Sequence, residues 1–455
     1  MTQTAWRRLT AEPETLGLPG PTPLDMAKVL RSVRADPLSY LGRVRAQYGE
    51  LVPFPVPGVP VLLVNEPDDA RHVLQGNARN WTKRTVQYSA LARVTGPGLL
   101  ASAEPDWIAH RRIAAPAFHH QRLERIGEQV HAAADDAVSS LATTRGEVVD
   151  VAPAVLQVAL DAVGRALFAA DLSGRARTML HASDDAASLV VRLGRALLPI
   201  PQAVPTPLNL RLASARRRLT RATAELLAER RRAATGGDDL LGLLVDSGLD
   251  DEAIRDELVT MVIAGHETVA ASLTWTLMLL AEHPEAQARV HAELDALADR
   301  AEPVSMLRHR AQLPWLAAVV DEALRLFPPA WVVSRRSAGP DVISGHDVPE
   351  GTTVIISPWL LHRREDLWPD PLAFRPERFL DERAARSTYL PFGLGPRLCI
   401  GREFALGEMA IVLARVLSAY ELRTPAGWTR PRPQAQVAVH PRGGLRLALT
   451  PRGRL

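Results

Sequence analysis

One segment constrains the fold of this chain more than any other: a nearly uninterrupted apolar stretch from about residue 251 to residue 283. Asp251 can cap the start of a helix there, and Pro284 follows its last residue, His283. At 1.5 Å per residue, about 30 residues make a rod of about 45 Å, long enough to cross a domain. Apolar residues lie on nearly every side of this helix, so it must be buried. The sequence therefore predicts a large fold built around one central helix.

The composition fits such a core and excludes several classes of protein. The chain has 455 residues, of which 47% are hydrophobic and 23% charged, as in ordinary globular proteins. Its single cysteine, Cys399, cannot form an internal disulfide, which excludes a disulfide scaffold. Only Lys28 and Lys83 are lysines, and the other basic residues are arginines interspersed with 51 acidic residues. Because the net charge is only +3 and no basic face is evident, we expect no nucleic-acid partner.

The sequence predicts no membrane segment. Met1 to Gly17 contains charged residues and lacks the apolar core of a signal peptide. Gly265, His266 and Glu267 interrupt the long apolar stretch, which argues against a transmembrane helix. We therefore expect a cytoplasmic protein without a membrane span.

Thirty-six prolines divide the chain into many helices, and no repeat or linker marks a domain boundary. We expect an irregular N-terminal arm over residues 1–35 and a single domain over residues 36–455. Two β-rich regions are predicted, at about 45–65 and about 330–360, from their Val content and turn residues. Apolar residues at i, i+3 and i+4 predict helices through most of the remainder. The predicted fold class is mainly α with a minor β region.

The most specific short segment surrounds the single cysteine. It reads Phe392-Gly-Leu-Gly395-Pro-Arg397-Leu-Cys399-Ile-Gly401, and good helix formers follow it. The free amides and the dipole at the start of a helix stabilise a nearby thiolate. The glycines allow a tight loop, and Arg397 supplies a cation suited to an anionic cofactor edge. A lone cysteine is more often a small buried hydrophobe, but this context favours a stabilised thiolate.

A second segment, Ala264-Gly265-His266-Glu267-Thr268, lies in the middle of the central helix. Gly, His and Thr are middling to poor helix formers, and a buried charge is costly without a partner. Taken alone, the segment fits a glycine-weakened helix whose threonine bonds back to a carbonyl oxygen. His266 and Glu267 also begin the zinc motif HExxH, but Ala270 stands where the second histidine is required. The segment therefore does not form that zinc site.

Three further motifs accompany these two: Trp107-Ile-Ala-His110-Arg111, Glu322-Ala-Leu-Arg325 and Phe374-Arg-Pro-Glu-Arg378-Phe379. Glu322 and Arg325 lie on one helix face and can pair. In sequence order and in spacing, the motifs resemble those of the cytochrome P450 family: WxxxR, [AG]Gx[DE]T, ExxR, PERF and FxxGxRxCxG. The resemblance covers the chain from about residue 35 to its C-terminus.

This resemblance implies the cytochrome P450 fold, a triangular prism with haem between the long central helix and the helix after the cysteine loop. It implies haem b (iron protoporphyrin IX) as the cofactor, with Cys399 as the axial ligand of the metal. Other positions correspond to cofactor-binding residues of the family, namely Trp107, Arg111, Gly265, Arg336, Phe392, Arg397 and Gly401. Arg335 is the alternative to Arg336, because the alignment there is ambiguous.

The resemblance also implies roles for residues away from the cysteine. Thr268 and Glu267 correspond to the catalytic alcohol and acid that relay protons to bound oxygen. Glu322, Arg325 and Arg378 correspond to a structural group that holds the cysteine loop in place. The positions expected to line the substrate pocket are Ile263, Ala264, Ala330, Trp331 and Val332. These residues are apolar and favour a lipophilic substrate such as a terpenoid, fatty acyl or polyketide compound, with residues 196–208 as a flexible lid.

The implied activity is that of a haem-thiolate monooxygenase, an oxidoreductase of secondary metabolism that activates O2 and hydroxylates or epoxidises its substrate. No GxGxxG or P-loop motif is present, so we expect a separate ferredoxin or flavodoxin, with its reductase, to supply two electrons. We expect a monomer. Two alternatives stay open: a peroxide-driven peroxygenase or another thiolate-haem enzyme such as an isomerase, and a haem-free helical binding protein.

Overall fold

The computed structural model describes residues 16–452 except 57, 144–147, 234–236, 238, 382–387 and 170–203, where Ala182, Asp185 and Leu189 alone are described. The chain divides into two compact units. The sheet unit comprises Met1–Ser89, Ala330–Ala373 and Ala385–Cys399, and the helical unit comprises Ala90–Pro329, Phe374–Ala384 and Ile400–Leu455. The single domain over residues 36–455 stays a prediction.

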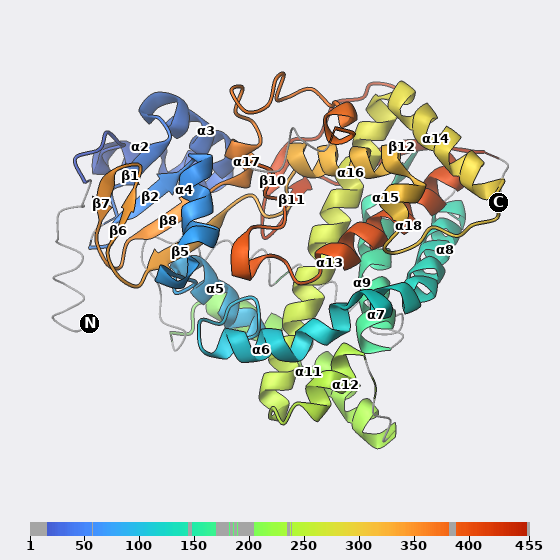
Figure 1. Ribbon diagram of the computed structural model, residues 1–455, viewed down its shortest axis with the longest axis horizontal. Helices are drawn as coiled ribbons and strands as arrows, with labels where there is room; N and C mark the ends of the chain where they lie inside the picture. Colours follow the sequence, from blue (N-terminus) through green and yellow to red (C-terminus); the bar gives the residue numbers. More distant parts are fainter. Residues whose placement is uncertain are drawn as a thin grey trace. The chain divides into compact units, whose positions relative to one another are not determined.

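The sheet unit is built on a five-stranded sheet in the order β1-β2-β8-β5-β3 (Figure 1). Its strands are β1 (Leu51–Phe54), β2 (Val61–Val64), β3 (Trp81–Thr82), β5 (Val333–Ser337) and β8 (Thr353–Ile356). β1 and β2 form an antiparallel hairpin, β2 pairs with β8 in parallel, and β8 pairs with β5 antiparallel. A ribbon of β6 (Asp341–Ile343) and β7 (His346–Val348) also belongs to this unit. The strands of the main sheet other than β3 lie within the regions that the sequence predicts to be β-rich.

The N-terminal arm is only partly irregular, which corrects the sequence prediction for residues 1–35. Helix α2 (Pro23–Ala35) occupies its last third. The Thr22 hydroxyl accepts a hydrogen bond from Asp25 N at 3.2 Å, and Asp25 Oδ2 accepts one from Thr22 N at 3.0 Å. This reciprocal cap is a helix-start signal, and Pro23 is pre-set for the first turn. The signal is short and stands among prolines that favour a turn, which explains the wrong prediction.

Apolar side chains from the main sheet and from neighbouring helical segments form the core of the sheet unit. Leu62, Val64, Val354 and Ile356 contribute from the strands, and Val73 from η1 (His72–Gly76). The other helical segments are α3 (Pro37–Tyr48), α4 (Pro67–Arg71), η2 (Ala78–Asn80), α17 (Pro358–Leu361) and η5 (Gly395–Arg397).

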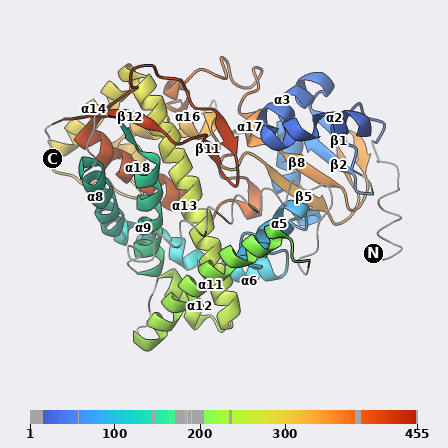
Figure 2. The same ribbon diagram turned by 180° about the vertical axis from the view of Figure 1, so that it is seen from behind.

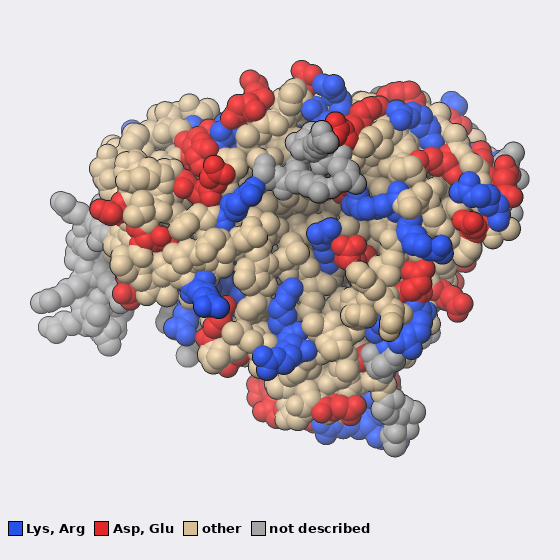
Figure 3. Space-filling view, in the orientation of Figure 1, with Lys and Arg blue, Asp and Glu red and all other residues tan. Residues whose placement is uncertain are grey.

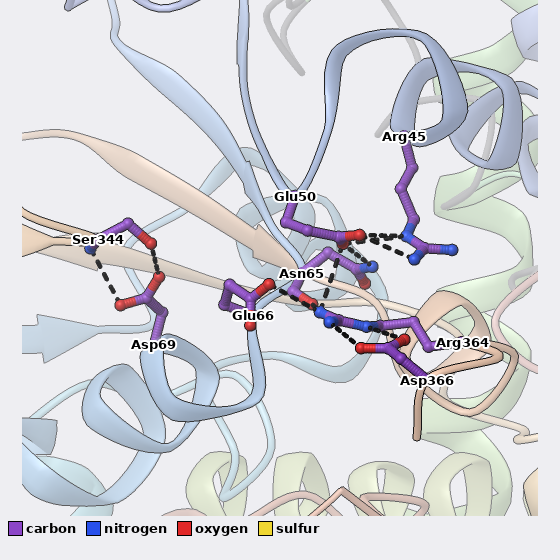
Figure 4. Close-up of polar contacts among 8 residues, drawn as sticks. All are labelled: Arg45, Glu50, Asn65, Glu66, Asp69, Ser344, Arg364 and Asp366. Carbon is purple, nitrogen blue, oxygen red and sulfur yellow. Dashed lines mark hydrogen bonds and ion pairs between the residues drawn. The ribbon is translucent and has the colours of Figure 1, made fainter. Parts of the chain in front are cut away.

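A polar network beside β2 centres on Arg364 (Figure 4). Arg364 is 7% exposed, and its guanidinium lies 3.5 Å from Glu50, 3.0 Å from Glu66 and 2.5 Å from Asp366. It also donates to Asn65 O at 2.8 Å. Because a buried guanidinium is costly without acceptors, these contacts fix the chain around Arg364.

The helical unit is built around α13 (Asp251–Glu282), 32 residues long. Its cap is Asp250, whose Oδ1 accepts from Ala253 N at 2.8 Å, so the prediction of Asp251 as the cap was wrong by one residue. The helices that pack on α13 include α9 (Ala152–Phe168), α11 (Pro207–Ala233), α16 (Pro314–Leu326) and α18 (Arg402–Ala419) (Figures 1 and 2).

The C-terminal half of α13 is buried from Val269 to Ala281. Trp275 is fully buried, and its ring stacks on Phe327 with 3.9 Å between centroids. Its Nε1 donates to Val439 O at 2.8 Å, so the indole is both packed and hydrogen-bonded. The buried central helix predicted from the sequence is confirmed.

Shorter elements surround these helices. The remaining helical segments, the first of which begins in the sheet unit, are α5 (Val86–Thr95), α6 (Asp106–Ala114), η3 (Ala115–Phe118), α7 (His120–Arg125), α8 (Gly127–Thr143), α12 (Leu240–Asp246), α14 (Pro284–Ala298), α15 (His309–Gln312) and η4 (Pro376–Phe379). The strands are β4 (Val148–Asp150), β9 (Tyr420–Arg423) and β12 (Arg446–Pro451) in one sheet, with β10 (Pro433–Ala435) and β11 (Val439–Pro441) in another. The predicted fold class, mainly α with a minor β region, is confirmed.

Two further properties concern the distribution of surface charge and the hydropathy of the helices. Lys and Arg side chains are interspersed with Asp and Glu on the face drawn in Figure 3. None of the described helices is long and apolar enough to span a membrane.

Candidate active site

The segment around the single cysteine forms a tight loop in the sheet unit. Cys399 N donates to Phe392 O at 3.0 Å, and Leu398 N donates to Gly395 O at 3.0 Å. Gly395 has a φ of +70°, and a Cβ there would lie 2.0 Å from Leu74 O in η1. Only glycine tolerates both this backbone conformation and this close approach. The motif glycine is therefore required to close the loop against η1.

The same loop leaves its side chains accessible. Cys399 is exposed, and none of the residues 392–399 is buried, although Phe392, Leu394 and Leu398 are large and apolar. Arg397 is partly exposed and places a cation in the same loop. An accessible thiol among apolar side chains and a cation suits a flat apolar macrocycle with a metal at its centre and acidic groups at its edge. The residues present would therefore fit a haem, with Cys399 as the predicted ligand of its iron.

One face of α13 is open in a part of the helix that is otherwise buried. Between Glu257 and Ala281, the residues that are not buried are Ala264, Gly265 and Thr268. Their spacing of i, i+1 and i+4 places them on one face of the helix. The accessible face therefore coincides with the motif that the sequence singled out in this helix.

The polar side chains of this motif have different surroundings. Thr268 Oγ1 donates to Ala264 O at 2.8 Å, while Glu267 is only 5% exposed. His266 is buried, and its Nδ1 donates to Val262 O at 2.5 Å. Burial lowers the pKa of His266 to about 4, so its ring is neutral at neutral pH. Thr268 is thus the accessible polar group of the motif.

Gly265 is also needed for packing. A Cβ at this position would lie 2.8 Å from Val163 Cγ2 of α9. Glycine therefore allows α9 to approach α13 closely at the centre of the helix. This contact gives Gly265 a structural reason besides the cofactor-binding role predicted for it.

The Trp107-to-Arg111 motif lies on α6 in the helical unit. Trp107 is 9% exposed, and the Arg111 guanidinium lies over its ring, 5.7 Å from the centroid. This distance is typical of a cation–π contact, which orients the two side chains together.

Arg335 and Arg336 are adjacent on β5, so their side chains point to opposite faces of the sheet. Arg335 is 5% exposed and donates to Tyr88 Oη at 3.4 Å. Arg336 is partly exposed and packs against Gly351, where a Cβ would lie 3.3 Å from its Nη2. The two alternatives that the sequence left open therefore have different surroundings.

The ExxR and PERF motifs meet at one carboxylate. Glu322 is fully buried and accepts from Arg325 Nε at 2.7 Å and from Arg325 Nη2 at 2.8 Å. It also accepts from Arg375 N at 2.9 Å and from Arg378 Nε at 3.4 Å. The first two bonds lie within α16, and the last two join α16 to η4 and its N-cap residue Arg375.

The predicted site residues divide between the two units. The helical unit contains Trp107, Arg111, Ile263, Ala264, Gly265, Glu267, Thr268, Glu322, Arg325, Arg378 and Gly401, and the sheet unit contains Ala330, Trp331, Val332, Arg336, Phe392, Arg397 and Cys399. Of the predicted pocket residues, Ile263 is buried, whereas the other four are partly exposed. Residues 196–203 of the predicted lid lie outside the described residues, and the last two residues of that segment begin α11.

Sequence reasoning missed one buried polar contact. His110, inside the Trp107-to-Arg111 motif, pairs through Nδ1 with Glu257 of α13. An acidic residue on the apolar central helix, six positions after its first residue, was the available signal.

Comparisons with known proteins agree with these features. A family model described as "Cytochrome P450" matches residues 17–447. "Cyclooctat-9-en-7-ol 5-monooxygenase" of Streptomyces melanosporofaciens is 33% identical, and the match covers 86% of each chain. "Pentalenene oxygenase" of Streptomyces avermitilis is 34% identical over 91% of this chain and 93% of its own. "Leukotriene-B4 omega-hydroxylase 3" of Mus musculus is 31% identical over 87% of this chain and 81% of its own.

Proposed function

The chain belongs to the cytochrome P450 family as a haem-thiolate monooxygenase, and from this premise we propose that it hydroxylates or epoxidises a terpenoid. Enzymes of this family use O2 and electrons from a redox partner, and they act on lipophilic substrates. We further propose haem b as the cofactor and a ferredoxin or flavodoxin, with its reductase, as the electron donor. A monomeric state and a cytoplasmic location stay predictions.

The observation that carries the proposal is the open face of α13 at Ala264, Gly265 and Thr268. This face combines apolar surface with a single accessible hydroxyl, which suits an apolar substrate and one reacting oxygen. The names of both Streptomyces relatives refer to polycyclic terpenoid compounds. A terpenoid is therefore favoured over the fatty acyl and polyketide substrates that the sequence left open.

The cysteine loop would hold the cofactor. Cys399 would provide the thiolate ligand, and Arg397, Arg111 and Arg336 would neutralise the propionates. When bound, a thiolate-ligated haem supplies O2 activation and transfer of one oxygen atom to the substrate. The apolar side chains of the loop would exclude water from the thiolate and so preserve its electron-donating character.

Thr268 and Glu267 would supply protons. A threonine hydroxyl has one donor hydrogen and two acceptor lone pairs, so it can donate to Ala264 O and still accept a hydrogen bond from a neighbour. Rotation of the Thr268 hydroxyl would turn its own hydrogen from Ala264 O to the open face of α13, where it would be passed on as a proton. Glu267, which adjoins it on the helix, would replace the proton.

Substitution of Thr268 tests this role against a control on the same helix. Thr274 also donates to the carbonyl oxygen four residues earlier, at 2.7 Å, but it is buried. We expect Thr268→Ala to lower the yield of product per NADPH by about 10²-fold, within the range for loss of a proton-transfer group, whereas Thr274→Ala leaves it unchanged. An equal yield in wild type and Thr268→Ala would contradict the role of Thr268.

The substrate and the cofactor are tested by spectroscopy. Titration of the purified haem protein with terpenes, fatty acids, steroids and macrolides should shift the Soret band with the terpenes. Cys399→Ser should abolish the thiolate signature of the reduced, carbon monoxide-bound protein. A product formed with peroxide alone, and not with reductase and O2, would instead support the peroxygenase alternative.

A further inference from the structure

A buried carboxylate joins three segments of the helical unit. Glu257 of α13 is 1% exposed, and its Oε1 accepts a hydrogen bond from Leu99 N at 2.9 Å. The same oxygen contacts His110 Nδ1 on α6. Its Oε2 has no hydrogen-bond partner among the described residues. One atom of Glu257 therefore holds both the loop before α6 and α6 itself on the central helix.

The loop before α6 is in direct contact with α13. A Cβ on Gly98 would lie 2.3 Å from Thr260 Oγ1, and one on Gly96 would lie 1.9 Å from Asp256 Oδ2. Since Gly96 also has a φ of +71°, the loop can follow this path only with glycine there. The loop and the central helix are therefore in contact over more than one turn of α13, from Asp256 to Thr260, and Glu257 lies within that turn.

The His110 side chain is 14% exposed, so solvent protons reach it. Its hydrogen bond to Glu257 raises its pKa above the ordinary value of 6.5, burial opposes this, and Asp106 on its own helix adds to the rise. Asp256, which adjoins Glu257 on α13, has its own pKa raised to about 6, chiefly by burial.

We propose that His110 and Glu257 are positioning residues for the haem-binding residues on α6, and that their ion pair makes haem retention depend on pH. α6 carries Trp107 and Arg111 one helical turn or less from His110. This inference rests on the proposed role of Trp107 and Arg111 toward haem. Protonated His110 holds α6 on α13 through its ion pair with Glu257. When the ring is neutral, only a weaker hydrogen bond joins the two side chains. α6 then loosens, together with Trp107 and Arg111.

The sign of the effect follows from the raised pKa. The ion pair is fully formed below the ordinary histidine pKa and is lost as the pH rises through the raised value. We therefore expect haem to dissociate from the wild-type holoenzyme faster at alkaline pH. The dissociation rate should rise in a single step as the pH passes through the raised pKa of His110. Loss of one charge-assisted hydrogen bond corresponds to about a tenfold to hundredfold change.

The experiment measures transfer of haem from the holoenzyme to apomyoglobin between about pH 6 and about pH 10, a range that spans the ordinary histidine pKa and higher values. His110→Gln keeps a donor but cannot titrate, so the step should vanish. Glu257→Gln keeps an acceptor but removes the charge, so the step should move to lower pH. The matched control is His119→Gln, at an exposed histidine beyond α6, which should keep the wild-type profile.

A merely structural role would speed haem loss at every pH and leave the wild-type step in place in both variants, and that result would overturn the proposal. If either variant does not fold, the double variant His110→Leu/Glu257→Met replaces the pair by apolar side chains and should give a flat profile. A step that survives in the double variant would also overturn the proposal. Failure of the wild-type protein to bind haem would instead contradict the proposed function.

Discussion

Two buried glutamates on neighbouring helices of the helical unit differ sharply in their surroundings. Glu322 on α16 and Glu408 on α18 are both 0% exposed. Glu322 accepts four hydrogen bonds from three arginines, whereas neither carboxyl oxygen of Glu408 has a hydrogen-bond partner among the described residues. The same side chain is therefore buried once as a paired carboxylate and once alone.

The difference shows that burial by itself does not determine which charges surround an acid. Glu322 lies 2.7 Å from the guanidinium group of Arg325 and 3.4 Å from that of Arg378. Burial without a partner raises the pKa of Glu408 well above its ordinary value, because burial favours the neutral form of the carboxyl group. Glu322 holds two elements together, whereas the burial of Glu408 lowers the stability of the fold by an amount that the surrounding core tolerates.

Removal of the charge from Glu322 should have the largest effect. In Glu322→Gln, the side-chain NH2 group would face the guanidinium donors, and the charge of buried Arg325 would lose its counter-ion. Breaking a buried ion pair in this way costs about 3–5 kcal/mol, enough to unfold many domains. We expect a loss of haem-loaded protein and a large fall in the denaturant midpoint.

Glu377→Gln is the control for that prediction. Glu377 belongs to the PERF motif but is 57% exposed and pairs with Arg289 at 2.8 Å. Its loss should cost less than about 1 kcal/mol. Equal stability of the Glu322 and Glu377 variants would show that the buried group is not essential to the fold.

Replacement of Glu408 should increase the stability of the folded state, whereas replacement of Glu322 decreases it. Glu408→Leu removes a buried polar group of similar size, so the folded state should gain about 1–3 kcal/mol at neutral pH. The raised pKa makes wild-type stability fall relative to the variant as the pH rises above the ordinary carboxyl value. Chemical denaturation at several pH values measures both effects.

The control for this prediction lies on the same helix. Glu403→Leu, at a position in the first turn that is 39% exposed, should not change the pH dependence of stability. If Glu408→Leu were strongly destabilising at all pH values, the isolated glutamate would have partners that it uses, and the comparison with Glu322 would fail.

The comparison also shows what the sequence could predict. The i, i+3 spacing predicted that Glu322 pairs with Arg325, and the family resemblance implied that Arg378 joins them; the structure places these side chains in contact. Glu408 was not singled out, because the pattern of α18 contains no sign of what faces that position. Local spacing reports on partners within one helix, whereas burial depends on helices from distant parts of the chain.

The same distinction holds for the central helix. Its length and burial follow from the apolar composition and are confirmed by α13. The open face at Ala264, Gly265 and Thr268 depends on how neighbouring elements pack, and the His110–Glu257 pair joins residues 147 positions apart. Such long-range contacts are outside the reach of periodicity, which explains why that pair was missed.

The smallest effect on stability is expected for an exposed carboxylate, Asp366 in the sheet unit. Asp366 is 57% exposed and binds Arg364 through both carboxylate oxygens, and these bonds lower its pKa (Figure 4). Water screens the Arg364–Asp366 pair, and Arg364 keeps its ion pairs with Glu50 and Glu66 when Asp366 is replaced. Asp366→Asn should therefore lower the free energy of unfolding by less than about 1 kcal/mol. The lowered pKa means that the contribution is present above the ordinary carboxyl value and disappears as the pH falls through the lowered one. A cost as large as that of Glu322→Gln would show that the number of acceptors around an arginine, and not burial, sets the energy of these groups.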